Sequence, residues 1–433
     1  MILYPHFDTN AAGHLTVGGM DTVALAREFG TPAYILDENV IRQNCRTYLS
    51  AARAHFGENA LPLYASKALS FTGIYRIVAE EGLGIDCVSG GELYTAKNAD
   101  FPAERIYFHG NNKTDADLRQ ALLMGVGTIV VDGMEELEAL DAIARELGKT
   151  QKILLRITPG IDPHTHRAIM TGNVDSKFGN AIVTGQALAI TKKALSLGGV
   201  VLAGFHCHIG SQIFDIEPFR DAADIMLKFI ADVKAATNFE ATELNLGGGL
   251  GVRYTEDDRG IDYADAIAKI AEIVREGAKK SGVAMPRVIL EPGRSLVAAA
   301  GVTLYTVGSV KEIPGFRNYV SVDGGMPDNP RYALYGSQYT ALIANRANDP
   351  KDYRATVAGR CCESGDLIGE GMALQAPRRG DILAVLCTGA YNYSMASNYN
   401  RLPRAPIVLV KDGKAKIAVR RESYEDLVRC DQK

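Results

Sequence analysis

Several features that would assign a chain to a class of protein are missing from this sequence. No C-x-x-C pair occurs, and the cysteine count is odd, at seven. Both facts argue against a disulfide framework or a structural zinc site and favour a reducing compartment. Residues 1–13 lack the basic start and apolar core of a signal peptide. We therefore expect a cytoplasmic protein.

Long apolar runs and strong charge are missing as well. No apolar run approaches the roughly 18 residues that indicate a transmembrane helix, so we expect no membrane span. The formal net charge is −4, and no dense Lys/Arg tract occurs. We therefore expect neither nucleic acid nor a membrane surface as a partner. The hydrophobic share of 47% and the length of 433 residues suit a globular protein of two domains.

A strand-and-helix alternation fills the chain from residue 60 to 291. Eight short apolar runs are each followed by a segment of helical periodicity, at 61–66, 84–88, 105–109, 128–132, 152–158, 201–208, 242–246 and 287–291. Lys67 and Glu291 are 224 residues apart, a mean of 32 for each of the seven intervals. A strand, a crossover helix and two loops need roughly 30 residues. The pattern predicts a (β/α)8 barrel over residues 38–296, with a doubly wound open sheet as the alternative.

The pattern changes after residue 296. Strand-like segments joined by Gly, Pro and Asp turns follow, at 302–310, 319–322, 355–359, 381–386 and 407–410. An isolated strand at 31–36 precedes the barrel, and we expect it to join the later sheet. Residues 1–37 and 297–433 are thus predicted to form a discontinuous β domain.

Polar residues gather where the apolar runs end, and barrel active sites lie at the carboxyl ends of the strands. The set comprises Lys67, Asp86, His109, Asn111, Asp132, Arg156, His208, Gly247, Gly248, Gly249, Glu291 and Arg294. Strand ends also meet ordinary polar loops, which is the alternative for any single member. The chemical types in the set are more specific than loop polarity requires.

Lys67 and Asp86 follow the first two runs. A lysine at the end of an apolar strand is expected to lose solvation, which favours the neutral, nucleophilic amine. Asp86 would then steer its protonation. The alternatives are a surface lysine and a turn aspartate.

The last two runs end in an anion-binding pattern. Consecutive glycines at 247–249 let backbone N–H groups surround an anion, although a tight turn is the alternative. Gly293 and Arg294 could complete a phosphate cradle or bind a carboxylate. Glu291 could pair with a ring nitrogen or form a salt bridge with Arg294.

Two H-x-H pairs raise the possibility of a metal. His206 and His208 would share a strand face, and His164 with His166 form a second pair. A metal-dependent barrel hydrolase is therefore an alternative. A strand-8 site rich in carboxylates with further histidines is missing, so we expect no metal. Stacking on a flat cofactor ring suits His208 better.

Substrate contacts are expected from the later segment. Cys362 beside Glu363 could supply a proton and hold an amine, whereas a buried small residue is the alternative for Cys362. Arg331 and Tyr335 are four apart and would share a face if helical. Their alternative is solvated surface.

Taken together, the motifs resemble the diaminopimelate decarboxylase family, pyridoxal-phosphate (PLP) enzymes of the alanine-racemase-like barrel class. The resemblance covers nearly the whole chain. Its most specific elements are Y-A-S-K at 64–67, S-G-G-E-L at 89–93, S-K-F-G at 176–179, F-H-C-H-I-G-S-Q at 205–212, G-G-G-L-G at 247–251, E-P-G-R-S at 291–295, C-E-S-G-D at 362–366 and G-A-Y at 389–391.

The resemblance implies a role for each matching residue. Lys67 would form the imine with the cofactor, and Cys362 would be the proton donor. The implied cofactor contacts are Lys67, Asp86, His208, Ser211, Gly248, Gly249, Glu291, Gly293, Arg294 and Tyr391. The implied substrate contacts are Arg294, Arg331, Tyr335, Glu363 and Tyr391.

The resemblance also implies a homodimer, in which Cys362 and Glu363 reach the partner's active site through the β domain. The expected reaction converts meso-2,6-diaminopimelate to L-lysine and carbon dioxide. Four positions depart from the family pattern and bear on the shape of the pocket: Leu69, Tyr332, Tyr339 and Arg360. The alternatives are an ornithine, arginine or carboxynorspermidine decarboxylase of the same fold, and a non-catalytic cofactor carrier.

Overall fold

A computed structural model describes residues 3–161 and 175–432. The chain divides into two compact units. The barrel unit comprises Cys45–Gly251 and Ile261–Gly293, and the β unit comprises Met1–Asn44, Val252–Gly260 and Arg294–Lys433. The histidines His164 and His166 lie outside the described residues.

Eight parallel strands form the barrel unit, in the spatial order β13-β12-β11-β9-β8-β7-β6-β5. They are β5 Leu63–Ala65, β6 Gly84–Cys87, β7 Ile106–Phe108, β8 Thr128–Val131, β9 Gln151–Thr158, β11 Val200–His206, β12 Glu243–Asn245 and β13 Arg287–Ile289. Each lies within or overlaps one of the eight predicted runs. Leu63 N–H donates to Leu290 C=O at 2.8 Å, which links the first strand to the end of the last. This link favours the barrel and excludes the open sheet.

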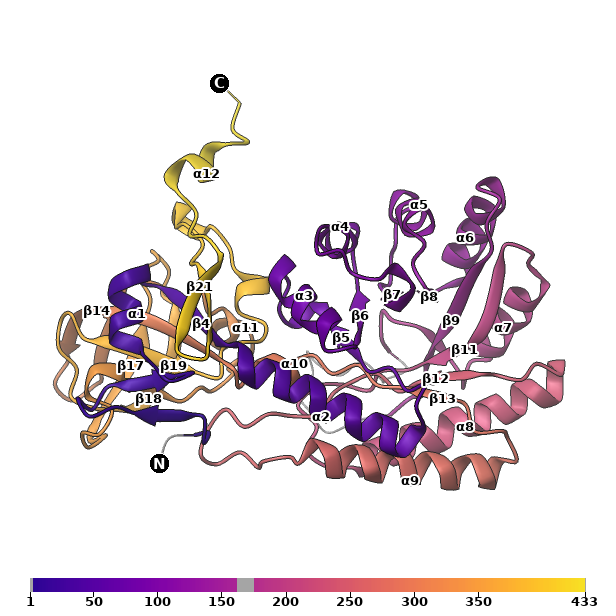
Figure 1. The fold of residues 1–433 in the computed structure, drawn as a ribbon, viewed down its shortest axis with the longest axis horizontal. Helices are drawn as coiled ribbons and strands as arrows, with labels where there is room; N and C mark the ends of the chain where they lie inside the picture. Colours follow the sequence, from indigo (N-terminus) through magenta and orange to yellow (C-terminus); the bar gives the residue numbers. More distant parts are fainter. Residues whose placement is uncertain (1–2, 162–174, 433) are drawn as a thin grey trace. The chain divides into compact units, whose positions relative to one another are not determined.

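Helices separate the barrel strands along the chain (Figure 1). They are α3 Thr72–Glu80, α4 Gly90–Asn98, α5 Asp115–Met124, α6 Met134–Glu146, α7 Gln186–Ser196, α8 Glu217–Thr237 and α9 Tyr263–Ser281, and α2 Glu38–Phe56 precedes them. In α6, Leu137, Leu140 and Ile143 are buried, as their helical spacing predicts. A short strand, β10 Asn180–Ala181, adds to β9.

Side chains fill the interior of the barrel, so it is a packed core. One cluster takes buried residues from six strands: Leu63, Tyr107, Val130, Leu154, Ala203 and Ile289. Burial of both faces explains why these strands read as apolar runs rather than as an alternation. Because the interior is filled, a site can form only at the ends of the strands, where the polar residues lie.

The β unit contains a mixed sheet whose main path is β18-β17-β15-β14-β4-β20-β21, with β19 paired to β14 and β16 paired to β19. The strands are β4 Ala33–Asp37, β14 Gly301–Glu312, β15 Asn318–Val322, β16 Ala341–Ile343, β17 Tyr353–Ala358, β18 Leu367–Leu374, β19 Ile382–Leu386, β20 Ile407–Lys411 and β21 Lys414–Val419. Strand β4 pairs antiparallel with β14 and parallel with β20. The prediction that the early strand joins the later sheet is confirmed.

Short elements complete the β unit. A small sheet is formed by β1 Phe7–Thr9, β2 Leu15–Val17 and β3 Met20–Asp21. The helices are α1 Thr22–Phe29, α10 Arg294–Val297, α11 Arg331–Tyr335 and α12 Tyr424–Val428. Within the described residues, no helix combines the length and the apolar character that a membrane span requires.

Candidate active site

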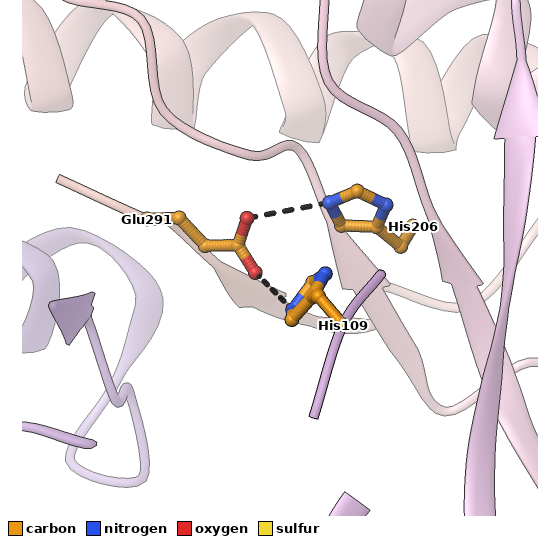
Figure 2. A group of neighbouring side chains, drawn as sticks. All are labelled: His109, His206 and Glu291. Atoms are coloured by element: carbon orange, nitrogen blue, oxygen red, sulfur yellow. Dashed lines mark hydrogen bonds and ion pairs between the residues drawn. The ribbon is translucent and has the colours of Figure 1, made fainter. Parts of the chain in front are cut away.

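In the barrel unit, a buried carboxylate lies against two imidazoles (Figure 2) and against an amide. Glu291 follows β13, and its Oε1 lies 2.7 Å from Asn245 Nδ2 and 2.9 Å from His109 Nε2. Its Oε2 lies 3.3 Å from His206 Nε2. All four residues are buried. The strand ends thus converge on one ionisable group.

The surroundings keep this carboxylate charged. Burial alone would raise the pKa of Glu291, but the imidazoles of His109 and His206 bring it well below its ordinary range. Burial lowers the pKa of His206 to about 4, so its ring is neutral at pH 7. Asp86 lies 3.9 Å from His109 Nε2, and burial raises the pKa of Asp86 despite that histidine.

Lys67 lies in a 3-10 turn, Ser66–Ala68, directly after β5. Its side chain is exposed, so the expectation that Lys67 has lost its solvation is wrong. The strand is buried, but the turn directs this side chain to solvent between buried Ser66 and Ala68. The Lys67 charge opposes the burial-driven rise in the pKa of Asp86, and it adds to burial in lowering the pKa of His208. Lys67 is therefore close enough to influence both groups.

The glycine loop after β12 admits no side chain at its centre. A Cβ on Gly248 would lie 2.1 Å from the carbonyl oxygen of Glu291. Gly249 has a φ of +123°, and a Cβ there would lie 2.6 Å from the Gly210 carbonyl oxygen. Glu291 N–H also donates to Gly247 C=O at 2.8 Å. This close-packed loop of bare backbone fits the cradle expected for a phosphate.

The other predicted cofactor contacts of the barrel unit lie around this loop. Gly293 packs against the strand that precedes Lys67, since a Cβ there would lie 2.9 Å from Ala65 Cβ. His208 is half-buried, and a Cβ on Gly247 would lie 2.7 Å from its Nδ1. Ser211 follows β11 and is half-buried.

The two histidines of the predicted H-x-H pair, His206 and His208, have different neighbours. His206 contacts Glu291, whereas His208 lies against the glycine loop. His109, His206 and Glu291 do offer three atoms of the kinds that bind metal ions, all within 4.8 Å of one another. The Glu291 carboxylate contacts both imidazoles directly, so the geometry favours a carboxylate–imidazole cluster over a metal site.

A second constellation lies in the β unit, around Tyr391. Its ring lies 4.7 Å from the guanidinium of Arg294 and 5.4 Å from that of Arg331. Arg294 Nη1 donates to Tyr254 Oη at 2.7 Å, and both arginines are buried. Arg331 begins α11 and lies 5.2 Å from the Tyr335 ring, so the prediction that these two share a helical face is confirmed.

Cys362 and Glu363 are exposed on a loop of the β unit. The Asp366 carboxylate holds this loop by accepting hydrogen bonds from Met326 N–H at 2.5 Å and Cys361 N–H at 2.7 Å. Cys362 N–H donates to Asn400 Oδ1 at 2.8 Å. No disulfide joins any of the seven cysteines, all of which lie within the described residues. The exposed thiol contradicts the alternative of a buried small residue.

The four departures from the family pattern have local contacts. Leu69 is buried, and its carbonyl accepts from Tyr64 Oη at 2.8 Å. Tyr332 Oη donates to Glu370 at 2.5 Å. Tyr339 stacks edge-on against Tyr254 at 5.1 Å, whereas Arg360 is exposed.

Sequence reasoning assigned no role to several residues of these constellations. Asn245 was part of an apolar run, yet it binds Glu291. His109 was noted only for its place at a strand end. Tyr254 was not singled out, although it binds Arg294. The sequence does contain one indication of a role for Asn245: it is an amide inside an apolar strand that leads directly into a glycine loop.

Comparisons with known proteins agree with this geometry. Residues 41–298 match the family "Pyridoxal-dependent decarboxylase, pyridoxal binding domain". Diaminopimelate decarboxylase of Bacillus subtilis is 48% identical over 100% of this chain and 98% of its own. That of Staphylococcus aureus is 43% identical over 98% and 99%. A crystal structure of the M. jannaschii enzyme with L-lysine has a TM-score of 0.91 at 35% identity, covering 100% of this chain and 99% of that one.

The family match over residues 41–298, together with the parallel barrel, shows that the chain is a PLP-dependent decarboxylase. The identities over the full length narrow this class further. The chain belongs to the diaminopimelate decarboxylase family.

Proposed function

We propose that this chain decarboxylates meso-2,6-diaminopimelate to L-lysine and carbon dioxide, the last step of lysine synthesis. The observation that carries the proposal is the buried, ionised Glu291 beside a glycine cradle, in a chain 48% identical over its length to a named diaminopimelate decarboxylase. Bound PLP would supply the electron sink for the bond that breaks.

The residues proposed to hold PLP come mostly from residues 38–296. Lys67 would hold it covalently, and Glu291 would accept a hydrogen bond from its protonated ring nitrogen. The remaining proposed contacts are Asp86, His208, Ser211, Gly248, Gly249, Gly293, Arg294 and Tyr391. The bare backbone of the cradle and the exposed amine of Lys67 support this assignment.

Residues of 1–37 and 297–433 would set substrate specificity. Arg294 and Arg331, with Tyr335 and Tyr391, are proposed to bind the distal carboxylate. A substrate without that carboxylate would leave buried charges unpaired, which is costly. Glu363 would hold the distal amine, and Cys362 would deliver a proton to the α-carbon.

We also propose a cytoplasmic homodimer in which Cys362 and Glu363 act in the partner's active site. Both side chains are exposed in the single chain, which leaves them available to a partner. The absence of a disulfide among the seven cysteines, all of them described, supports a reducing compartment.

The lysine assignment is tested by trapping. Borohydride reduction in the presence of added PLP should label the wild type and leave Lys67→Ala unlabelled, with loss of the absorbance near roughly 420 nm that a protein-bound PLP imine gives. Lys97→Ala, at another exposed lysine of the barrel unit, should behave as wild type. A labelled Lys67→Ala protein would refute the assignment.

The substrate is tested by incubating the protein separately with diaminopimelate, ornithine, arginine and lysine, and measuring carbon dioxide. We expect release from diaminopimelate alone. Preference for ornithine or arginine would favour the alternative decarboxylases, and no release from any would favour a carrier. Stoichiometric metal by elemental analysis would favour the hydrolase.

A further inference from the structure

Glu291 is fixed from three sides by residues that have no assigned role. Asn245 approaches Oε1 at 2.7 Å, His109 approaches the same atom at 2.9 Å, and His206 approaches Oε2 at 3.3 Å. Figure 2 shows the two imidazoles converging on the carboxylate. Their exposed fractions are 0% for Asn245, 1% for His206 and 4% for His109, so water does not substitute for them.

The barrel dictates this convergence. Asn245 ends β12 and His206 ends β11, and the strand register pairs these two residues directly. Ile289 of β13 pairs with Asn245, and Glu291 is two residues further on. Neighbouring parallel strands therefore present the amide, the imidazole and the carboxylate at one end of the barrel.

We propose that Asn245, His206 and His109 are positioning residues that hold Glu291 as an oriented carboxylate for the ring nitrogen of PLP. This inference rests on the proposed function. The three residues would touch neither substrate nor cofactor and would act through Glu291.

The physical reason lies in how these residues solvate the charge. A buried carboxylate needs hydrogen bonds in place of water. A cationic partner would supply such hydrogen bonds, but its positive charge would also offset the negative charge of the carboxylate. The pKa of His206, lowered by burial to about 4, makes that ring a neutral donor, and an amide is always neutral. Neutral donors stabilise the charge and leave it available to a cationic ring nitrogen.

Asn245 also ties the carboxylate to the glycine loop. Its Nδ2 donates to Glu291, and its Oδ1 accepts from Gly247 N–H at 2.8 Å. The backbone N–H of Glu291 returns to Gly247 C=O. One side chain thus connects the proposed ring-nitrogen partner with the proposed phosphate cradle, and its loss should weaken both.

The test compares Asn245→Leu, His206→Leu and His206→Gln. Glutamine can retain a donor near the imidazole Nε2, whereas leucine cannot. Hydrogen bonds to charged groups contribute roughly 1.5–3 kcal/mol, which corresponds to about 10- to 100-fold in a binding constant. We expect both leucine variants to raise the PLP dissociation constant of the cofactor-free protein by that factor and to change the absorption spectrum of bound PLP.

The kinetic expectation distinguishes positioning from general damage. For the two leucine variants kcat should fall, while KM for diaminopimelate stays within about threefold, because the proposed substrate contacts are untouched. His206→Gln should recover most of the PLP affinity and spectrum. Circular dichroism and melting temperature establish that each variant folds. Should Asn245→Leu not fold, the two His206 variants decide the question.

Wild-type PLP affinity and spectrum in folded His206→Leu and Asn245→Leu proteins would overturn the proposal. So would a metal bound stoichiometrically in wild type and lost in His206→Leu, since the cluster would then be a metal site. Failure of the proposed function gives a different result, because wild-type protein would not take up PLP at all.

Discussion

At the scale of single residues, Tyr391 combines an unusual backbone conformation with contacts to two arginines. Its φ of +59° is uncommon for a bulky residue and costs roughly 1–3 kcal/mol. The guanidinium groups of Arg294 and Arg331 both lie within 5.4 Å of its ring. Two buried guanidinium groups beside one ring suit the anion that is proposed to bind here. The surrounding structure thus maintains a strained residue where a substrate carboxylate is proposed to bind.

Replacing Arg331 by alanine should therefore raise KM for diaminopimelate by roughly 10- to 100-fold, the worth of hydrogen bonds to a charged group. The PLP spectrum should not change. Arg354, an exposed arginine of the same unit, provides the control: Arg354→Ala should leave KM within about twofold. Steady-state kinetics gives both numbers, and an unaltered KM in Arg331→Ala would remove this residue from the substrate site.

Asp328 gives a prediction about pH. Burial raises its pKa to about 7, with Asp323 and Asp366 adding to the rise and Gly325 N–H and Arg421 opposing it. The unfolded chain ionises Asp328 near pH 4, whereas the folded protein keeps the proton up to about pH 7. The free energy of unfolding therefore decreases as pH rises from about 4 to about 7, by up to about 4 kcal/mol from this group.

Asp328→Asn removes this loss. Its melting temperature should match wild type near pH 4, exceed it increasingly up to pH 7, and stay above it by a constant margin at higher pH. Differential scanning calorimetry at a series of pH values measures the gap. Asp349→Asn, at an exposed position of the same unit, should show no gap. A gap that closes toward pH 8 would contradict the assignment.

Residue identity was easier to predict than residue environment. Lys67, Asp86 and Glu291 could be selected because each chemical type follows an apolar run, where barrel sites lie. The exposure of Lys67 could not, because it depends on a single turn that directs one side chain outward. The link from Asn245 to Glu291 was equally hidden, since it joins different strands through their register.

At the scale of elements, the glycine loop after β12 is packed closely against the end of β13. The carbonyl of Glu291 occupies the space that a Cβ on Gly248 would take, at 2.1 Å. Backbone cannot move aside as a flexible side chain can. From the sequence, the glycines are explained only as a tight turn or an anion cradle. The structure adds a second reason for glycine at 248, because the backbone after β13 leaves no room for a side chain there.

Gly248→Ala should accordingly displace the loop or the strand end that carries Glu291. We expect a loss of roughly 1–3 kcal/mol in unfolding free energy, typical of overpacking, and weakened PLP binding in the protein that folds. Gly198→Ala is the matched control, since nothing lies within 4 Å of a Cβ there. Denaturant unfolding and PLP titration measure the two effects. Equal behaviour of both variants would show that the loop tolerates a side chain.

Element prediction succeeded where burial is uniform. Each of the eight barrel strands lies within or overlaps the run predicted for it, because burial on both faces leaves an apolar signature. Strand β21 was missed, since its largely exposed residues, with Lys414 and Lys416, give no such run. Strand β18 was missed because Gly369 and Gly371 interrupt its apolar residues.

At the scale of the whole molecule, we propose that the active site is shared between two chains. Cys362 and Glu363 are exposed in the single chain, although a proton donor and an amine ligand should be shielded from water. Their loop is nevertheless well held, by Asp366 and by Asn400. A fixed loop with exposed functional side chains is what a shared active site would require, and a sequence alone carries no such spatial information.

Subunit mixing tests this arrangement. Lys67→Ala and Cys362→Ala should each be inactive or nearly so alone. If each site combines Lys67 of one protomer with Cys362 of its partner, a mixed dimer contains one site with both residues intact and one with neither. Random mixing in equal amounts makes half of the dimers mixed, so about one quarter of wild-type activity should return. Carbon dioxide release after co-refolding or co-expression measures the recovered activity, and sedimentation establishes that dimers have formed.

Mixing Lys67→Ala with a Lys67→Ala, Cys362→Ala double variant should restore no activity, because no intact Lys67 is present. No recovery in verified mixed dimers of the two single variants would place Cys362 in its own subunit's site.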